Sequence, residues 1–198
     1  MFTGLIAMQG VVHTVTHRRH GLRLVMVAPR AARRARVGDS LAVHGVCLTV
    51  AATTRGRLMF DVIPSTLRCT TIRSWSSGQR VHVEEPLRAG QRMHGHLLLG
   101  HVDGTARVAA VGRRGCERWL TLTLPSTLRR YCVPKGSIAI DGVSVTIATL
   151  RDGCLRVCLI PTTLRKTRLG RLAPGDRVNV ETDVLIKAAR GRRHSRTT

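Results

Sequence analysis

The stretch SLAVHGVCLTV at residues 40–50 returns as SIAIDGVSVTI at residues 137–147. Ser, Ala, Gly, Val and Thr recur at matching places, and the other aliphatic positions exchange only for aliphatic residues. The match extends without insertion or deletion over residues 40–84 and 137–181, at a constant offset of 97. A period of this length exceeds that of a solenoid repeat or a propeller blade. We therefore expect two homologous domains, each with its own core.

Each copy has the alternation and the turn signals of short β-strands. In the first copy, apolar residues alternate with other residues on both sides of Gly45, as is typical of strands with one buried face. Gly56 and Gly153 end dipeptides that favour hairpin turns. We expect about six strands in each copy, and a closed barrel is the arrangement that leaves no strand edge exposed. The predicted fold is therefore all-β, with two homologous six-stranded antiparallel barrels in tandem.

The repeat also predicts the domain boundaries. We expect the first barrel over residues 1–95 and the second over residues 96–183. Residues 184–198 are expected to form a short C-terminal helix and a basic tail. The helical pattern covers residues 183–190 and is expected to end near Gly191, because glycine commonly follows the last helical turn.

The chain is strongly basic, with 33 Lys and Arg residues against 11 Asp and Glu and a formal net charge of +22. Such an excess attracts phosphates and nucleic acids non-specifically at low salt. Dedicated nucleic-acid sites usually add aromatic stacking platforms, whereas aromatic residues make up only 3% of this chain. We therefore expect solvated arginines without specific nucleic-acid binding. An RNA-associated basic protein is the alternative, and its binding would weaken steeply with salt.

The cysteines and the apolar runs predict the compartment. The six cysteines form no CxxC pair, which favours reduced thiols over a disulfide framework. No run of residues approaches the roughly 20 apolar positions needed to cross a bilayer. The first residues also lack the charged and apolar regions of an export signal. We expect a cytoplasmic protein that has no membrane partner.

Six motifs carry a resemblance to a known family. In order, they are MFTG at 1–4, GVCLTV at 45–50, FDVIPSTLR at 60–68, GHVDG at 100–104, KGSIAIDGVSVT at 135–146 and GDRVNVETDVLIK at 175–187. Together they make the chain resemble riboflavin synthase of the alpha-chain type, from residue 1 to about residue 187. The order and spacing of the motifs over nearly the whole chain make this resemblance specific.

The resemblance implies a dismutase. Members of the family take two molecules of 6,7-dimethyl-8-ribityllumazine and transfer a four-carbon unit from one to the other, releasing riboflavin and 5-amino-6-ribitylamino-pyrimidinedione. The reaction implies no cofactor and no metal. The implied fold is a pair of Greek-key barrels followed by a C-terminal helix. The implied assembly is a homotrimer in which each active site lies between barrels of neighbouring subunits.

The duplication suits a reaction between two copies of one substrate, because two similar pockets can hold the reacting carbons face to face. The two copies must nevertheless treat donor and acceptor differently. We therefore expect chemically active positions to differ between the repeats. Four such pairs differ, namely Cys47/Ser144, His44/Asp141, His82/Asn179 and Pro86/Asp183.

The resemblance also assigns site residues by position. Cys47, His101, Ser144 and Asp183 are implied in catalysis. Ser144 would bond the pteridine or the attacking group, Asp183 would place or deprotonate the nucleophile, and His101 would shuttle a proton from the acidic C7 methyl. The implied substrate-binding set holds the ring edges and the ribityl chain. It comprises Phe2, Thr3, Gly4, Ile6, Ser40, Cys47, Thr49, Ile63, Thr66, His101, Lys135, Ser144, Thr146, Ile160 and Thr163.

Several of these residues have a structural alternative. A lone cysteine in a strand is commonly a small core residue, and a carboxylate at the start of a helix, such as Asp183, is commonly a cap. His94, His96 and His101 raise the question of zinc, but no cysteine or carboxylate completes a usual ligand spacing. A non-catalytic lumazine- or flavin-binding protein with the same tandem barrels is the alternative function.

Some residues depart from the family pattern. They include His44 and His82, which replace the usual asparagines, and most of them fall in or near the first barrel. We expect these departures to affect the ribityl contacts of the first pocket more than the chemistry of the second barrel.

Overall fold

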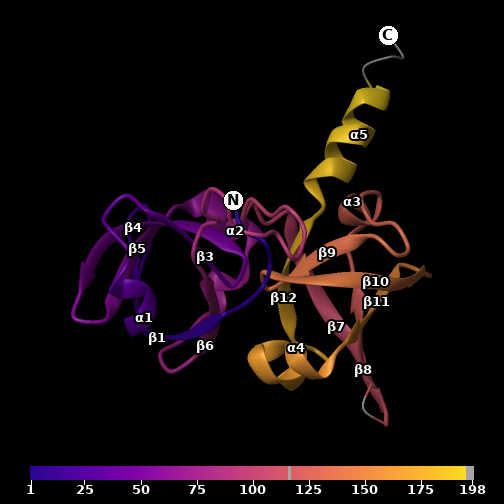
Figure 1. The fold of residues 1–198 in the computed structure, drawn as a ribbon, viewed down its shortest axis with the longest axis horizontal. Helices are drawn as coiled ribbons and strands as arrows, with labels where there is room; N and C mark the ends of the chain where they lie inside the picture. Colours follow the sequence, from indigo (N-terminus) through magenta and orange to yellow (C-terminus); the bar gives the residue numbers. More distant parts are fainter. Residues whose placement is uncertain (116, 195–198) are drawn as a thin grey trace.

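The structure, a computed structural model, describes residues 1–115 and 117–194. Its strands form two closed six-stranded antiparallel barrels, which lie side by side in Figure 1. The predicted all-β fold with two homologous barrels is therefore confirmed. In the described part of the chain, no helix is long and apolar enough to span a membrane.

The first barrel closes in the order β1-β2-β5-β4-β3-β6. β2 pairs with β5 instead of β3, so the chain crosses the barrel end in a Greek-key connection. Three short helices fill the connections. The elements are β1 (Met8–Arg18), β2 (Gly21–Val27), α1 (Pro29–Ala32), β3 (Ser40–Val43), β4 (Val46–Thr54), β5 (Arg57–Val62), α2 (Pro64–Cys69), η1 (Thr71–Ser74) and β6 (Arg80–Glu84).

The second barrel has the same cyclic order, β7-β8-β11-β10-β9-β12. Every strand of the first barrel therefore has a counterpart, and the repeat in the sequence is a repeat in topology. The elements are β7 (Gly104–Arg114), β8 (Glu117–Thr123), α3 (Ser126–Arg129), β9 (Ser137–Ile140), β10 (Val143–Arg151), β11 (Cys154–Leu159), α4 (Pro161–Lys166), η2 (Arg168–Arg171), β12 (Arg177–Thr182) and α5 (Val184–His194).

Each barrel has its own apolar core. Leu24 and Phe60 are fully buried in the first, and Leu120 and Ile138 are fully buried in the second. These side chains point inward from positions that alternate along each strand, as the period of two requires. Full burial of each such side chain contributes about 1.5–3 kcal/mol. The two separate clusters explain why the repeat appears as two domains.

A third, small cluster joins the barrels. Phe2, at the start of the chain, pairs with Leu98 in the connecting segment, through reciprocal backbone hydrogen bonds of 2.8 and 3.1 Å. Gly45 and Gly142 meet at the same junction. A Cβ on either glycine would lie 2.6 Å from the backbone nitrogen of the other, and both have positive φ. Because these two glycines hold equivalent repeat positions and meet reciprocally, the barrels are related by an approximate two-fold axis.

The C-terminal helix differs in length from the prediction. Asp183 precedes α5, and its carboxylate accepts a hydrogen bond from the amide of Leu185 at 2.9 Å. The helix then continues beyond Gly191 to His194. The expected end near Gly191 is wrong, because a single glycine lowers helix propensity without ending the helix. Figure 1 shows α5 pointing away from both barrels. The predicted tail residues 195–198 lie outside the described residues.

Candidate functional site

The segment that precedes each barrel crosses over to the other barrel. The amide of Ser144 on β10 donates to the carbonyl of Gly4, which precedes β1, at 2.9 Å. In the matching contact, the amide of Cys47 on β4 donates to the carbonyl of Gly100, which precedes β7, at 2.8 Å. Cys47 and Ser144 occupy equivalent repeat positions. Each edge that carries predicted site residues therefore combines main chain from both barrels.

Two buried glutamates hold these crossing segments. One carboxylate oxygen of Glu84 accepts from the amide of Thr3 at 2.7 Å and from its hydroxyl at 2.8 Å. The other accepts from the amide of Gly4 at 3.1 Å. Glu181 does the same in the second barrel, accepting from the amides of Leu99 and Gly100 at 2.8 and 3.0 Å. The crossing segments are thus fixed by paired charge-assisted hydrogen bonds.

Burial raises the pKa of both Glu84 and Glu181, while the amides that they accept from act in the opposite direction. Neither residue was among the predicted site residues. The signal was present in the sequence, because both copies of the motif GxRVxVE end in glutamate. What the sequence did not indicate is the partner, which lies about 80 residues away along the chain in both cases.

The predicted strand residues lie on equivalent outward faces of the two barrels. Cys47 and Thr49 alternate with the buried residues of β4. Ser144 and Thr146 hold the matching positions on β10, where the intervening Val145 is half-buried. Cys47 and Ser144 are half-buried at the junction, whereas both threonines are exposed. Ser40 lies opposite Thr49 in the β3–β4 register. The structure therefore gathers these side chains into two matched rows, one on each barrel.

The residues at the ends of β5 and β11 also match. Ile63 and Ile160 precede α2 and α4, and 59% and 63% of their surfaces are exposed. A branched apolar side chain left exposed at the same position in both repeats favours a contact with a ligand or another subunit. Thr66 and Thr163 lie one turn later and are half-buried. All four residues belong to the predicted substrate-binding set.

His96 contacts the second-barrel row and was predicted only as part of a doubtful zinc set. Its Nδ1 lies 2.7 Å from Oγ of Ser144. Burial lowers the pKa of His96, and the nearby carboxylate of Asp183 opposes that shift. Its Nε2 is buried without a hydrogen-bond partner within the described protein. Ser144 and His96 thus form a polar pair between β10 and the connecting segment, and Asp183, which precedes α5, acts on the imidazole by its charge.

The other predicted residues are divided between buried and exposed positions. Phe2 is buried in the junction cluster, and Ile6 packs in the core of the second barrel, although it precedes β1. His101 is exposed immediately after Gly100. Lys135 is exposed as well, with a positive φ of 66°, and its amide donates to the carbonyl of Ile147. Only part of the predicted set therefore meets within a single chain.

Two of the four diverged pairs belong to the barrel contact. His44 and Asp141 are buried against each other, with 3.2 Å between Nε2 and Oδ2. His82 and Asn179 are also buried there and bond the opposite barrel. The expectation that these two differences mark chemically active positions is wrong, because all four residues are buried in the contact between the barrels. The expectation that His44 and His82 affect the ribityl contacts of the first pocket stays a prediction. The side-chain polar atoms of His82 and Asn179 bond groups of the opposite barrel. Nδ1 of His44 and Oδ1 of Asp141 instead accept from amides of their own barrels.

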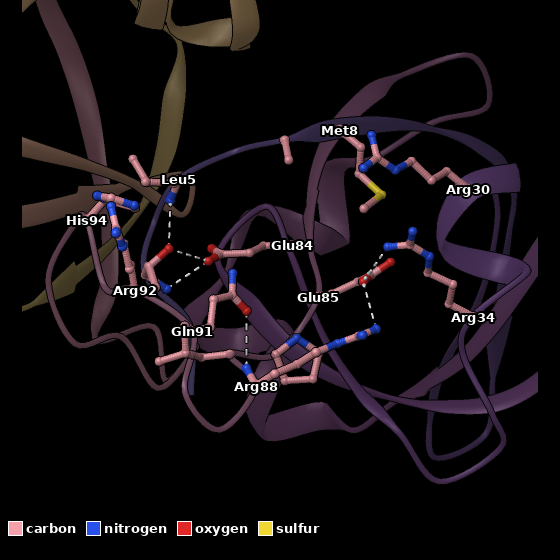
Figure 2. Close-up of a pocket in the computed structure, with 14 residues that line it drawn as sticks. Leu5, Met8, Arg30, Arg34, Glu84, Glu85, Arg88, Gln91, Arg92 and His94 are labelled. Carbon is pink, nitrogen blue, oxygen red and sulfur yellow. Dashed lines mark hydrogen bonds and ion pairs between the residues drawn. The ribbon is translucent and has the colours of Figure 1, made fainter.

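A cavity of about 410 Å³ opens on the first barrel beside Glu84, and Figure 2 shows its basic rim. Glu85 lies between Arg34 and Arg88, at 3.4 and 3.9 Å. Of the predicted site residues, only Thr3 lines this cavity. The full lining is Thr3, Leu5, Ala7, Met8, Arg30, Arg34, Glu84, Glu85, Pro86, Leu87, Arg88, Gln91, Arg92 and His94.

Metal ligands do not cluster in the described part of the chain. Among these residues, no group of three or more His, Cys, Asp and Glu side chains is arranged to hold a metal ion. The polar chemistry of the candidate site is therefore that of hydroxyls, imidazoles, a thiol and carboxylates.

The chain is similar to known proteins over nearly its whole length. The lumazine binding domain family matches the chain twice, over residues 3–85 and 99–183. The riboflavin synthase of Mycobacterium bovis (strain ATCC BAA-935 / AF2122/97) is 39% identical over 194 residues, covering 94% of this chain and 95% of that protein. The riboflavin synthase of Bacillus subtilis (strain 168) is 34% identical over 187 residues, covering 94% and 87%.

A solved structure shares the fold. The crystal structure of LumP complexed with riboflavin superposes with a TM-score of 0.84 at 26% sequence identity. The superposition covers 92% of this chain and 99% of that chain. The resemblance found in the sequence is therefore confirmed.

Proposed function

This chain belongs to the riboflavin synthase family, and we propose that the two barrel edges that carry Cys47 and Ser144 each hold one of the two lumazines that the reaction consumes. The chain is an enzyme that transfers a four-carbon unit between two molecules of 6,7-dimethyl-8-ribityllumazine. The products are riboflavin and 5-amino-6-ribitylamino-pyrimidinedione.

The observation that carries the proposal is the match between two backbone contacts. Ser144 with Gly4, and Cys47 with Gly100, form the same hydrogen bond at equivalent positions. Two similar edges suit two copies of one substrate, because each can hold the same ring and ribityl chain in the same way. The residues that differ, serine in one copy and cysteine in the other, then treat the two molecules unequally.

On the second barrel, Ser144 and His96 handle the proton. Burial favours the neutral imidazole of His96, and a neutral imidazole can accept the proton of the Ser144 hydroxyl or of a nucleophile bound there. The carboxylate of Asp183 would stabilise the imidazolium that forms. Asp183 also caps α5, so its place at this edge is fixed by the helix. Thr146, Ile160 and Thr163 would hold the ring and the ribityl chain.

On the first barrel, Cys47 and His101 have the equivalent place. Cys47 is half-buried beside Gly100, and His101 is the next residue after that glycine. An exposed imidazole can take a proton from the C7 methyl of a bound lumazine. Ser40, Thr49, Ile63 and Thr66 would make the contacts that their counterparts make on the second barrel. Lys135 and the segment Phe2 to Ile6 complete the proposed binding set.

We propose that the enzyme is a homotrimer in which the first barrel of one subunit faces the second barrel of another. Two features support this assembly. α5 extends away from both barrels (Figure 1), and Leu185 on it has 65% of its surface exposed. A projecting helix with exposed apolar residues is a natural subunit contact. Sedimentation velocity on the full chain tests the assembly, and a monomer at micromolar concentration would contradict it.

We also propose that the enzyme works in the cytoplasm without a metal or an organic cofactor. The thiols of Cys47, Cys69, Cys132, Cys154 and Cys158 are free, as suits a reducing compartment. The proposed residues supply the proton transfers by themselves, so treatment with a chelator should leave the rate unchanged.

The dismutation is tested with one substrate alone. The purified chain is incubated with 6,7-dimethyl-8-ribityllumazine, and both compounds are followed by absorbance. One riboflavin formed for every two lumazines lost supports the proposed function. Tight binding of lumazine without conversion would instead indicate the carrier function of a lumazine-binding protein.

A further inference from the structure

The junction between the barrels contains a polar pair that is unlike on its two sides. His44 and Asp141 hold equivalent repeat positions, both have positive φ, and each side chain is only 2% exposed. Nε2 of His44 contacts Oδ2 of Asp141 at 3.2 Å, without the alignment of a hydrogen bond. A buried polar pair of this kind is costly unless the two sides complement each other.

Each member is fixed to its own barrel in the same way. The amide of His82 on β6 donates to Nδ1 of His44 at 3.1 Å. The amide of Asn179 on β12 donates to Oδ1 of Asp141 at 2.8 Å. Because Nδ1 of His44 accepts a hydrogen bond, the ring proton is on Nε2, the nitrogen that contacts the carboxylate. The pair is therefore an N–H donor on one barrel against an acceptor on the other.

The surrounding contacts do not distinguish the barrels. His82 contacts the carbonyl of Asp141 at 2.8 Å, and Asn179 donates to the carbonyl of His44 at 2.9 Å. His82 also accepts from the amide of Arg168, and Asn179 accepts from the amide of Thr71, each at 2.7 Å. Histidine and asparagine thus make the same two bonds across the junction. A barrel could dock on a copy of itself with these bonds intact.

We propose that His44 and Asp141 select the unlike barrel, so that the first barrel of the chain docks on a second barrel and rejects another first barrel. Pairing of two first barrels would set two imidazole N–H groups against each other. Pairing of two second barrels would set two buried carboxylates together, which is strongly unfavourable. Only the unlike pairing joins donor to acceptor. The diverged residues therefore prevent mispairing between copies of the chain.

The environment of Asp141 is consistent with its role as the acceptor. Burial alone would raise the pKa of Asp141, but the imidazole of His44 and then that of His82, together with the amide of Asn179, hold it below its ordinary value. The other titratable groups at this contact are His82 on β6 and the Arg168 side chain on η2, whose charges act on each other. Trp75 packs edge-on against His44, with 5.7 Å between the ring centres.

An exchange of the two residues tests the proposal. His44→Asp places two carboxylates at the junction, and Asp141→His places two imidazoles there. Each single variant should lower the Tm by about 10 °C, the range for a broken buried pair in a chain of this size. The double exchange should recover most of this loss, because the new carboxylate would accept from the amide of His82 and the new imidazole from the amide of Asn179. A double variant no more stable than the weaker single variant overturns the proposal.

Acidity and assembly give two further readouts. Relative to the unmodified protein, His44→Asp should gain stability between pH 7 and pH 5, because two buried carboxylates then share a proton, and Asp141→His should lose it. In sedimentation velocity, the single variants should form mixed species and the double exchange a single one. Equal responses to pH in both single variants, or mixed species in the double exchange, would show that the pair does not select the partner.

Two controls keep the test independent of folding yield. If the single variants do not fold, His44→Asp combined with Asp141→Asn offers a gentler pairing, since the amide donates to the new carboxylate. Its stability should exceed that of Asp141→Asn alone, and the opposite order overturns the proposal. Exchange of the exposed pair Arg23 and Asp61, 2.8 Å apart on neighbouring strands, should leave the Tm within about 3 °C. None of these readouts uses catalytic activity.

Discussion

Nδ1 of His96 and Oγ of Ser144 lie 2.7 Å apart, joining the segment between the barrels to the first residues of β10. This contact brings a titratable group to a hydroxyl that the sequence pattern had already assigned to catalysis.

Replacement of His96 should remove proton transfer at the second-barrel edge. His96→Gln is expected to lower kcat about a hundredfold or more, the usual contribution of a positioned acid or base, with a small change in KM. His96→Asn is the matched control, because its amide can still bond Ser144 but cannot carry the proton. We expect the same loss of kcat in both variants. A kcat restored by His96→Asn would mean that His96 only positions Ser144.

Acidification should destabilise the chain through His82. Burial, followed by the neighbouring His44, lowers the pKa of His82 from 6.5 to about 4. The unfolded chain takes up a proton near pH 6.5, whereas the folded chain takes it up only near pH 4. Stability is therefore expected to fall by about 3 kcal/mol as the pH decreases through this range.

Denaturant unfolding at several pH values measures this effect. His82→Asn installs the residue of the equivalent position, Asn179, which makes the same kinds of bond. The variant should fold and should lose most of the stability change between pH 6.5 and pH 4. An unchanged slope in His82→Asn would assign the titration to another group.

The close approach of the barrels should not tolerate a side chain at Gly45. A Cβ there would lie 2.6 Å from the backbone nitrogen of Gly142, and φ is +80°. Gly45→Ala is expected to cost roughly 2–5 kcal/mol, as backbone strain and overpacking add. Gly78→Ala is the matched control, because Gly78 has a φ of +85° with nothing within 4 Å of the added Cβ. It should cost about 1–2 kcal/mol. Similar losses of stability in both variants would mean that backbone strain at positive φ is the sole cause.

Replacement of Glu181 should raise the reactivity of the Cys47 thiol on the other barrel. Glu181 holds the amides of Leu99 and Gly100, and the carbonyl of Gly100 accepts from the amide of Cys47. Glu181→Gln turns an amide group toward these donors, so the segment should loosen and expose the thiol. We expect alkylation of Cys47 to become several-fold faster, as measured by peptide mass spectrometry. Glu84→Gln, which loosens the other crossing segment, should leave this rate unchanged; acceleration in both variants would argue against the cross-barrel link.

The sequence predicted much of the fold because the relevant signals are local or repeated. Alternation around Gly45, turn dipeptides and the offset of 97 residues indicated two barrels. The family motifs named Ser144 and Cys47. The helix end near Gly191 was misplaced, because propensity at one residue decides little once a helix has begun.

The candidate site was predicted less completely, because its geometry depends on how the barrels dock. His96 was overlooked as the partner of Ser144, which is 48 residues away. His44 and Asp141 looked like diverged catalytic positions, but they pair with each other across the junction. The sequence alone does not show why two equivalent repeat positions differ. It can mark a reacting group or an interface that must be unlike on its two sides.

By itself, the amino-acid sequence determined that this protein is a doubled barrel of the riboflavin synthase family. Strand period, turns and motif spacing depend only on the order of residues along the chain. Only the tertiary structure decided which barrel completes which edge. The first residues of each half accept hydrogen bonds from the opposite barrel, while Glu84 and Glu181 of their own barrels hold them in position. Such contacts form between segments that are distant in the sequence and acquire their energy only when burial brings donors and acceptors together.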